Sequence, residues 1–132
     1  YGIAEAMGMV FAGARGETAA EISIVLHFDQ PQSELHKAFQ SLRNTTAGNL
    51  KGADYELKVA NRLWGQTGFP ILESYRDLTR THYGAEMQPV DFSQPAAVAE
   101  SINSWVTDQT NGKIRNFILK NYLCITYRPS SI

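Results

Sequence analysis

Three segments decide how this chain folds: NRLWGQ at residues 61–66, YGAEMQPVDF at residues 83–92, and INSWVTDQTNGKI at residues 102–114. Within the second segment, residues 86–92 predict a strand, and Pro89 favours a sheet edge or a bulge because proline donates no ladder hydrogen bond. Pro95 then suits the first turn of a helix, which Asn111-Gly112 ends. The apolar face of that helix is Val98, Ile102, Trp105 and Val106.

The first segment closes a stretch in which apolar and polar side chains alternate. One parity holds the apolar residues Tyr55, Leu57, Val59 and Leu63. The other parity holds Glu56, Lys58 and Arg62. A period of two predicts a half-buried strand with one solvated face. Pro70 next predicts the first turn of a helix. Its apolar stripe is Ile71, Leu72, Tyr75 and Leu78.

Upstream of these segments the sequence predicts two helices joined by a tight turn. The first helix has the buried stripe Ile3, Met7, Val10 and Phe11. Gly13 and Gly16 bracket its end, because glycine adopts the left-handed cap conformation without strain. Thr18 begins the capping box T-A-A-E, which predicts the start of the second helix. The apolar face of that helix is Ile22, Val25 and Leu26.

A third helix and a loop complete the expected elements. Ser33 is the predicted cap of a helix that carries Leu35, Phe39 and Leu42, and the polar residues 44–52 predict a loop. About five helices and two strands, in the order ααα-β-α-β-α, indicate an α+β fold. A lone strand pair is marginal in water, so a third strand is expected from the C-terminal tail, another chain or sequence not present here.

Composition excludes several classes of function. The 132 residues are 43% hydrophobic and carry 12 basic against 13 acidic residues, a balance that predicts no nucleic-acid partner and no basic membrane patch. No apolar run approaches the roughly 18 residues that span a bilayer. Cys124 is the only cysteine, so no internal disulfide forms. The cysteine count therefore does not distinguish an oxidising from a reducing compartment.

Taken together, the quoted segments resemble the serpins, a family of protease-trapping proteins. The residues MVFAGARGET at 9–18 look like the end of the family's helix B and its turn into helix C, and Asn61 to Trp64 look like the strand before helix E. The most specific block covers a strand and the whole of helix F. The resemblance runs from Ile3 to about Ile118, which predicts a partial serpin domain at residues 1–118 and a divergent tail at 119–132. The matching positions are Gly13, Arg15, Gly16, Thr18, Asn61, Trp64, Asp91, Phe92, Asn103, Trp105, Gly112 and Lys113.

The resemblance implies inhibition of serine endopeptidases through a covalent suicide mechanism. In that mechanism a reactive loop is cleaved and inserts as a new strand in the main sheet while the protease stays acylated. Two departures are expected to matter. Gly2 lies where the family usually has a serine, and no reactive loop follows helix F. A frameshift, a truncated gene and a domain fragment each fit the tail, so the chain is expected to be inactive alone. The alternative is a non-inhibitory remnant that acts as a protein-interaction module.

Other kinds of site find little support in the sequence. The scattered His27, His36 and His82 lack zinc spacing, and Ser41, Ser74 and Ser101 lack a nucleophile elbow, so we expect no metal, no cofactor and no catalytic residue. Asp91 and Glu100 would form a carboxylate pair only by accident of folding. Lys37, Arg43 and Lys51 predict a solvated face or, alternatively, a sulfated-polysaccharide site. The family's habit implies secretion, with cytoplasmic placement left open, and exposed sheet edges predict self-association.

Overall fold

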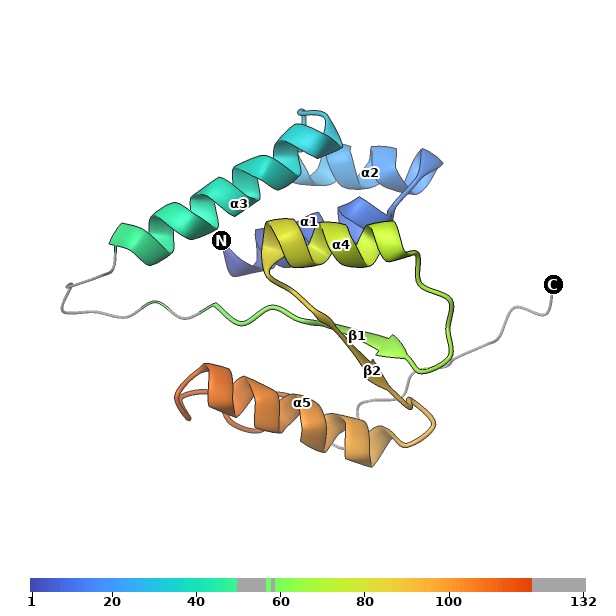
Figure 1. Ribbon diagram of the computed structural model, residues 1–132, viewed down its shortest axis with the longest axis vertical. Helices are drawn as coiled ribbons and strands as arrows, with labels where there is room; N and C mark the ends of the chain where they lie inside the picture. Colours follow the sequence, from blue (N-terminus) through green and yellow to red (C-terminus); the bar gives the residue numbers. More distant parts are fainter. Residues whose placement is uncertain (50–56, 58, 120–132) are drawn as a thin grey trace. The chain divides into compact units, whose positions relative to one another are not determined.

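A computed structural model describes residues 1–49, 57 and 59–119 of the chain. The helices are α1 (Gly2–Gly13), α2 (Gly16–Leu26), α3 (Gln32–Asn49), α4 (Glu73–Tyr83) and α5 (Pro95–Gln109). The strands β1 (Leu63–Gln66) and β2 (Met87–Val90) form a two-stranded sheet. The predicted α+β class and the order of elements are therefore confirmed (Figure 1). Among the described residues, no helix is both long and apolar enough to cross a membrane.

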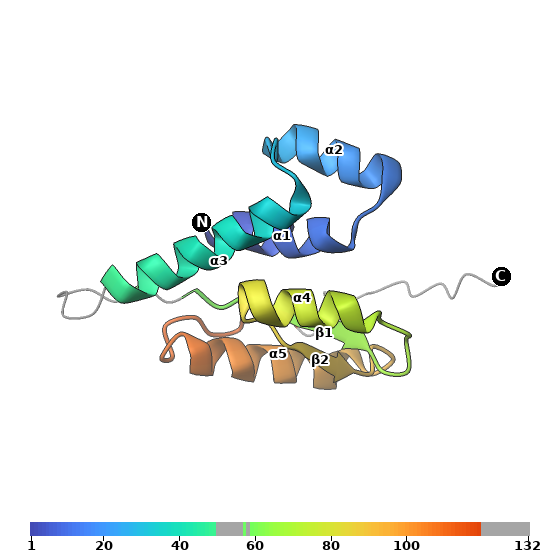
Figure 2. The same cartoon turned by 45° about the horizontal axis from the view of Figure 1, so that its top comes forward.

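The chain divides into two compact units. Unit 1 combines residues 1–57, 61–63 and 70–87, so it contains α1 to α4. Unit 2 combines residues 58–60, 64–69 and 88–132, so it contains α5 and most of each strand. In unit 1, α1 packs against α2, α3 and α4, and α3 also packs along α4 (Figures 1 and 2).

Aromatic rings form the centre of unit 1. Phe28 lies 5.5 Å from Phe11 and 6.1 Å from Phe39 between ring centroids, and Phe39 lies 5.7 Å from Tyr83. Tilted and edge-on ring pairs at these distances add to the stabilisation that apolar burial supplies. Met9 and Ala85 complete the buried cluster. Three helices and the residues after α2 thus share one core.

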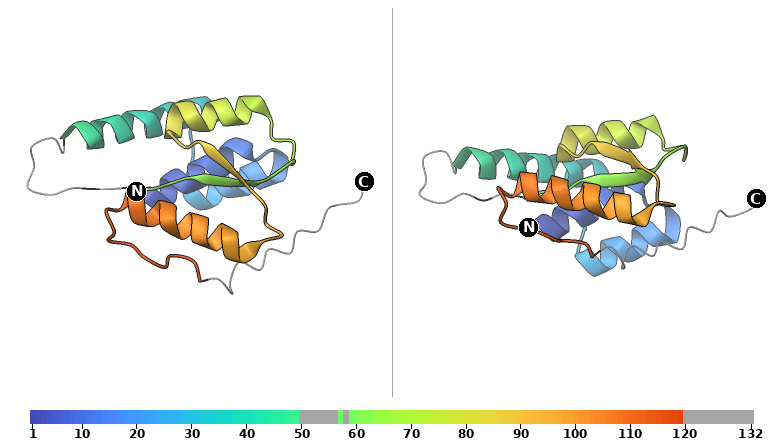
Figure 3. Two further views of the ribbon diagram at one scale, coloured as in Figure 1. Left: turned by 60° about the horizontal axis from the view of Figure 1, so that its bottom comes forward. Right: turned by 90° about the horizontal axis from the view of Figure 1, so that it is seen from below.

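In unit 2 the apolar face of α5 is covered by residues of the strands. Val98, Ile102 and Val106 are buried. Side chains from β1, from β2 and from the turn after β2 pack against them, together with one side chain of α5 itself and one from the chain after α5. Those side chains are Trp64, Val90, Phe92, Trp105 and Ile118. Figure 3 shows the α5 ribbon beside the strand pair. The predicted α5 face and its Pro95 start are confirmed.

The predicted face of α1 is partly wrong. Phe11 is buried, but Ile3 is 83% exposed and Val10 is 49% exposed, while Met9 lies in the core at 2%. The helix is apolar around most of its circumference (GIAEAMGMVFAG), so spacing alone does not select the buried side. Similarly, Val25 of α2 and Leu42 of α3 are exposed rather than buried.

The predicted start of α2 is also wrong. The helix begins at Gly16, with Arg15 as an N-cap that makes no side-chain cap bond, so Thr18 lies inside the helix and forms no capping box. Gly16 has a φ of 57°, as expected for a glycine in this turn, whereas Gly13 ends α1 within the helix. Gly16 rather than Gly13 therefore supplies the left-handed backbone.

Three further boundaries differ from expectation. Helix α3 begins at Gln32, ahead of the predicted cap Ser33, and extends through Asn49, so residues 44–49 are not a loop. The end of a helix can be as polar in sequence as a loop. Strand β1 begins at Leu63, and the more exposed Leu57 and Val59 lie outside it. Helix α4 begins at Glu73 rather than near Pro70. The predicted strand over 86–92 is confirmed in its central part, and the third strand expected in the tail falls on residues 120–132, outside the described residues.

Candidate functional site

A buried carboxylate joins α1 to the segment before β1. Glu5 is only 3% exposed although it lies on a helix of largely apolar residues. Asn61 Nδ2 donates to Glu5 Oε2 at 2.9 Å and to the Gly2 carbonyl at 3.1 Å, and the Tyr1 hydroxyl donates to Glu5 Oε1 at 3.4 Å. Burying a carboxylate is costly unless donors satisfy it. Asn61, a position predicted from the resemblance, therefore ties the segment before β1 to α1.

A second buried polar pair connects α3 to α4. The Tyr83 hydroxyl and His36 Nδ1 are 2.6 Å apart, and both residues are almost fully buried. Burial first, and the nearby Glu5 charge second, raise the pKa of Tyr83, so the phenol stays protonated. Burial first, and His82 second, lower the pKa of His36. The pair is thus held neutral in the native state.

His36 differs from an ordinary core histidine in one respect. Its Nε2 is buried and has no hydrogen-bond partner among the described residues. A buried polar atom without a partner loses the hydrogen bond that water would have supplied, which costs about 1–3 kcal/mol. Protonation of His36 would therefore place a charge on a buried ring whose Nε2 has no hydrogen-bond partner among the described residues.

Gly8 of α1 makes this close packing possible. A Cβ built on Gly8 would lie 2.7 Å from the Tyr83 hydroxyl and 2.9 Å from Phe39 Cε2. Neither distance is compatible with normal van der Waals contact. The absence of a side chain at residue 8 thus sets how near α1 comes to α3 and α4.

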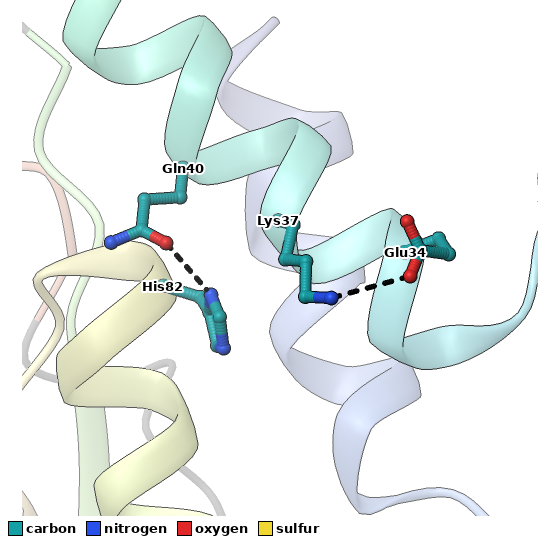
Figure 4. Close-up of polar contacts among 4 residues, drawn as sticks. All are labelled: Glu34, Lys37, Gln40 and His82. Carbon is teal, nitrogen blue, oxygen red and sulfur yellow. Dashed lines mark hydrogen bonds and ion pairs between the residues drawn. The ribbon is translucent and has the colours of Figure 1, made fainter.

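The basic residues of α3 do not form one patch in the described part of the chain. Lys37 Nζ lies 3.3 Å from Glu34 Oε1, and both side chains are more than half exposed (Figure 4). Such exposed pairs contribute little to stability. Arg43 instead turns a buried Nη1 toward Gly84, and Lys51 lies outside the described residues. Figure 4 also shows His82 Nδ1 paired with Gln40 Oε1 at 3.1 Å.

At the turn between α1 and α2, Arg15 acts as a backbone clamp. Its Nη1 donates to the carbonyls of Ala12 at 2.9 Å and Ala14 at 2.7 Å. Carbonyls at the end of a helix lack partners within the helix, so a cationic donor there satisfies them. Thr18 is exposed on α2 and takes no part.

In unit 2 the matched aromatic positions form a contact between a strand and a helix. The Trp64 and Trp105 ring centroids are 6.2 Å apart at an interplanar angle of 80°. The Phe92 amide donates to Gln66 Oε1 at 2.9 Å. Asp91 accepts from the Ser93 amide at 3.0 Å and from Gln94 Nε2 at 3.2 Å, and the Ser93 hydrogen bonds lower the pKa of Asp91. These contacts build the turn that leads into α5.

After α5, the side-chain amide of Asn103 holds the returning chain. Its Nδ2 donates to the Ile118 carbonyl and its Oδ1 accepts from the Ile118 amide, both at 2.8 Å. Thr110 ends the helix by accepting from the Ile114 amide at 3.1 Å, while Gly112 has a φ of 75°. Lys113, which donates its amide to the Thr110 carbonyl, is exposed. Of the positions predicted from the resemblance, Asn103 thus binds the backbone of the returning chain through its side chain.

The structure brings together some groups that the sequence left scattered. The rings of His36 and His82 lie 6.1 Å apart, yet within residues 1–49, 57 and 59–119 no set of three potential ligands is placed to hold a metal. Ser41, Ser74 and Ser101 are exposed on separate helices. The sequence did not point to Glu5 or to the pairing of Tyr83 with His36. The available signal was a single acidic residue among the apolar residues of the first helix.

Comparison with known proteins identifies the family. The family model for Serpin (serine protease inhibitor) matches residues 1–125. Leukocyte elastase inhibitor of Equus caballus is 43% identical over 119 residues, covering 89% of this chain and 31% of that protein. The Homo sapiens protein of the same name is 44% identical over 115 residues, covering 86% of this chain and 30% of that protein.

A solved structure extends the likeness to the fold. Serpin48 from the insect Tenebrio molitor superposes with a TM-score of 0.77 at 30% identity, over 92% of this chain and 32% of that structure. The chain thus spans about a third of the length of the relatives that it matches. Family match, relatives and fold agree, and this chain belongs to the serpin family.

Proposed function

We propose that this chain is the N-terminal frame of a serpin that inhibits serine endopeptidases by covalent trapping. The observation that carries the proposal is the 44% identity to human leukocyte elastase inhibitor, which extends over 86% of the chain. The frame's part would be mechanical. Helix α5 corresponds to the family's helix F and α1 to helix B, and the resemblance implies that both border the sheet that accepts the inserted loop.

The trap itself needs parts that have no counterpart among these residues. About two-thirds of the length of the matched relatives is not represented, and the sequence contains no hinge of small residues followed by a scissile bond. We propose that residues 1–132 alone form no complex with a protease. The catalysis in the family belongs to the trapped protease, so the chain is proposed not to be an enzyme.

A chimera tests whether the frame is competent. Residues 1–118 replace the matched segment of human leukocyte elastase inhibitor, and the product is incubated with leukocyte elastase. The expected result is an elastase–inhibitor complex that survives SDS, with the unmodified inhibitor as the positive control and residues 1–132 alone as the negative control. A chimera that folds but is cleaved without forming a complex would refute the proposal, and so would one that does not fold.

A non-inhibitory interaction module is the second candidate, and exposed apolar residues favour it. Ile24 and Val25 of α2 are 72% and 73% exposed, and Leu57 and Val59 ahead of β1 are 53% and 40% exposed. Large apolar side chains that are exposed at consecutive positions, as Ile24 and Val25 are on α2, often mark an interaction site. This candidate includes self-association through the exposed sheet edges. An inactive chimera together with a defined oligomer of the 132-residue chain would favour it.

Two finer assignments complete the proposal. We propose secretion by the family's habit, with cytoplasmic placement as the alternative. Fusion of the protein's own upstream coding sequence to a reporter would decide between them. We also propose that residues 119–132 diverge from the family, although the family match continues to residue 125. A second chimera that carries residues 1–132 should then give a lower yield of complex than the chimera that carries residues 1–118.

A further inference from the structure

A pocket of about 370 Å³ opens in unit 1 where the end of α1 meets the start of α4. Small-molecule sites commonly have volumes of about 300–1,000 Å³, so this pocket suits a small ligand. The lining side chains are mostly apolar. The lining residues are Ala12, Gly13, Arg15, Pro70, Ile71, Leu72, Ser74, Tyr75 and Leu78.

The polar groups of the pocket share one electrostatic character. Among the described residues that line the pocket, Arg15 is the only charged one, Ser74 adds a hydroxyl, and none is a carboxylate. The Tyr75 hydroxyl is already used, because it donates to the Met9 carbonyl at 3.1 Å. An apolar pocket with one cationic group and one hydroxyl is complementary to an amphipathic anion.

The position of Arg15 is set by its backbone contacts. Nη1 donates to the carbonyls of Ala12 and Ala14, while Nε and Nη2 make no hydrogen bond or ion pair within the described part of the chain. Two N–H-bearing nitrogens therefore remain for a ligand. A guanidinium presents its donors in a planar fork that matches the two oxygens of a carboxylate.

The start of α4 adds to the same potential. Its N-cap residue Leu72 makes no side-chain cap bond and so leaves the first backbone N–H groups of this 11-residue helix without a capping side chain of its own. Glu73 lies in the same turn and opposes this effect, but it does not line the pocket. The principal attraction for an anion is therefore Arg15.

We propose that this pocket binds a medium-chain aliphatic carboxylate. The carboxylate would accept hydrogen bonds from Arg15 Nε and Nη2 and from the Ser74 hydroxyl, and the alkyl chain would lie against Ile71, Leu72 and Leu78. The proposal does not rest on the inhibitory function, because binding to this pocket is measured without a protease.

The test uses the 132-residue chain and decanoate below its micelle concentration, with decanol as the uncharged control. Calorimetry is expected to show saturable binding of one decanoate per chain, at least 10-fold tighter than decanol. Backbone amide shifts in NMR spectra should be confined to residues 12–15 and 71–78. Equal affinity for decanoate and decanol, or several ligands per chain, would mean adsorption to exposed apolar surface and would overturn the proposal.

Matched variants separate the site from the rest of the chain. Arg15→Gln should weaken decanoate binding at least 10-fold, whereas Arg80→Gln removes the same charge from α4 outside the pocket and should change affinity less than 2-fold. Arg15→Lys should retain part of the affinity. Ser74→Trp should fill the pocket and abolish binding, and Ser101→Trp on α5 should not. Undiminished binding to either Arg15→Gln or Ser74→Trp would refute the assignment.

Discussion

At the scale of single residues, one glycine governs how three helices meet. Gly8 gives the Tyr83 hydroxyl and the Phe39 ring room to approach α1, and Tyr83 in turn lies 2.6 Å from His36 Nδ1. A glycine inside a helix normally costs about 1 kcal/mol relative to alanine. That cost is offset here because the polar pair and the aromatic core could not otherwise be packed together.

Gly8→Ala should therefore destabilise the chain in spite of its better helix propensity. Overpacking a filled core costs about 1–3 kcal/mol, more than the propensity gain. Urea denaturation followed by circular dichroism measures the change in free energy of unfolding. Gly13→Ala is the comparison, because the added Cβ would lie 3.3 Å from the Tyr75 ring on a more exposed surface. The free energy of unfolding of this variant should stay within about 1 kcal/mol of the wild-type value. A stabilised Gly8→Ala would contradict this packing.

His36 should make stability depend on pH. Because burial lowers its pKa, the native state binds this proton less readily than the unfolded chain. The stabilising contribution of neutral His36 is then complete above about pH 6.5, the ordinary histidine pKa, and is lost as the pH falls through the lower folded-state value.

Urea midpoints at pH 7.5 and pH 5.5 provide the measurement. His36→Gln can still hydrogen-bond to Tyr83 but does not titrate, so its midpoint should change less between the two pH values than that of wild type. The control is His27→Asn, at an exposed position whose φ of 53° asparagine tolerates, and it should keep the wild-type pH dependence. An unaltered acid response in His36→Gln would show that another group is responsible.

At the scale of elements, the sequence predicted which segments are helical better than it predicted their faces or ends. Spacing and Pro95 correctly placed α5, because its polar and apolar sides are distinct. In α1, Ile3 and Met9 are both apolar, and the tertiary neighbours determine which one is buried. The start of α2 was missed because Arg15 caps α1 with its side chain, an interaction that a capping-box pattern does not represent.

The side-chain contacts of the candidate site were less predictable from the sequence than the helices were, because they join residues far apart in the chain. Asn61 and Asn103 were identified through resemblance, but their partners Glu5 and Ile118 lie 56 and 15 positions away in the chain. Local patterns carry no information about contacts at such separations. The pairing of His36 with Tyr83, across 47 positions, was hidden for the same reason.

Asn103 should stabilise the segment after α5. It pairs with both backbone groups of Ile118, much as a neighbouring strand would. Asn103→Ala removes two hydrogen bonds and should lower the free energy of unfolding by about 1–3 kcal/mol. Hydrogen exchange at the Ile118 amide should become faster as well. Ser104→Ala, at the exposed neighbour, should alter neither quantity, and a protected Ile118 amide in Asn103→Ala would contradict the role.

At the scale of the whole molecule, the two units are interleaved along the sequence. Unit 1 consists of three separate segments of the chain, residues 1–57, 61–63 and 70–87. Both strands contribute residues to each unit, so neither unit corresponds to a continuous segment that could be expressed alone. The predicted boundary at residues 118 and 119 concerns family likeness and stays a prediction.

The 132-residue chain should bind a hydrophobic dye and self-associate. Ile24 and Val25 are among the most exposed of its large apolar side chains. The double change Ile24→Glu with Val25→Lys should reduce both dye fluorescence and the mass found by light scattering. The charge-matched control, Thr18→Lys with Ala20→Glu at exposed positions of the same helix, should reduce neither. A wild-type chain that is monomeric and ignores the dye would contradict this expectation.

The hydrogen bonds of Asn61 have a consequence for the order of folding. They join residue 61 to partners 56 and 59 positions earlier, so they require a long loop to close. Contacts between distant residues form slowly, whereas the turn at Arg15 involves only neighbours. We expect the Asn61 bonds to form after the folding transition state. Asn61→Ala would then accelerate unfolding and leave the refolding rate nearly unchanged, so that this amide determines the lifetime of the native state.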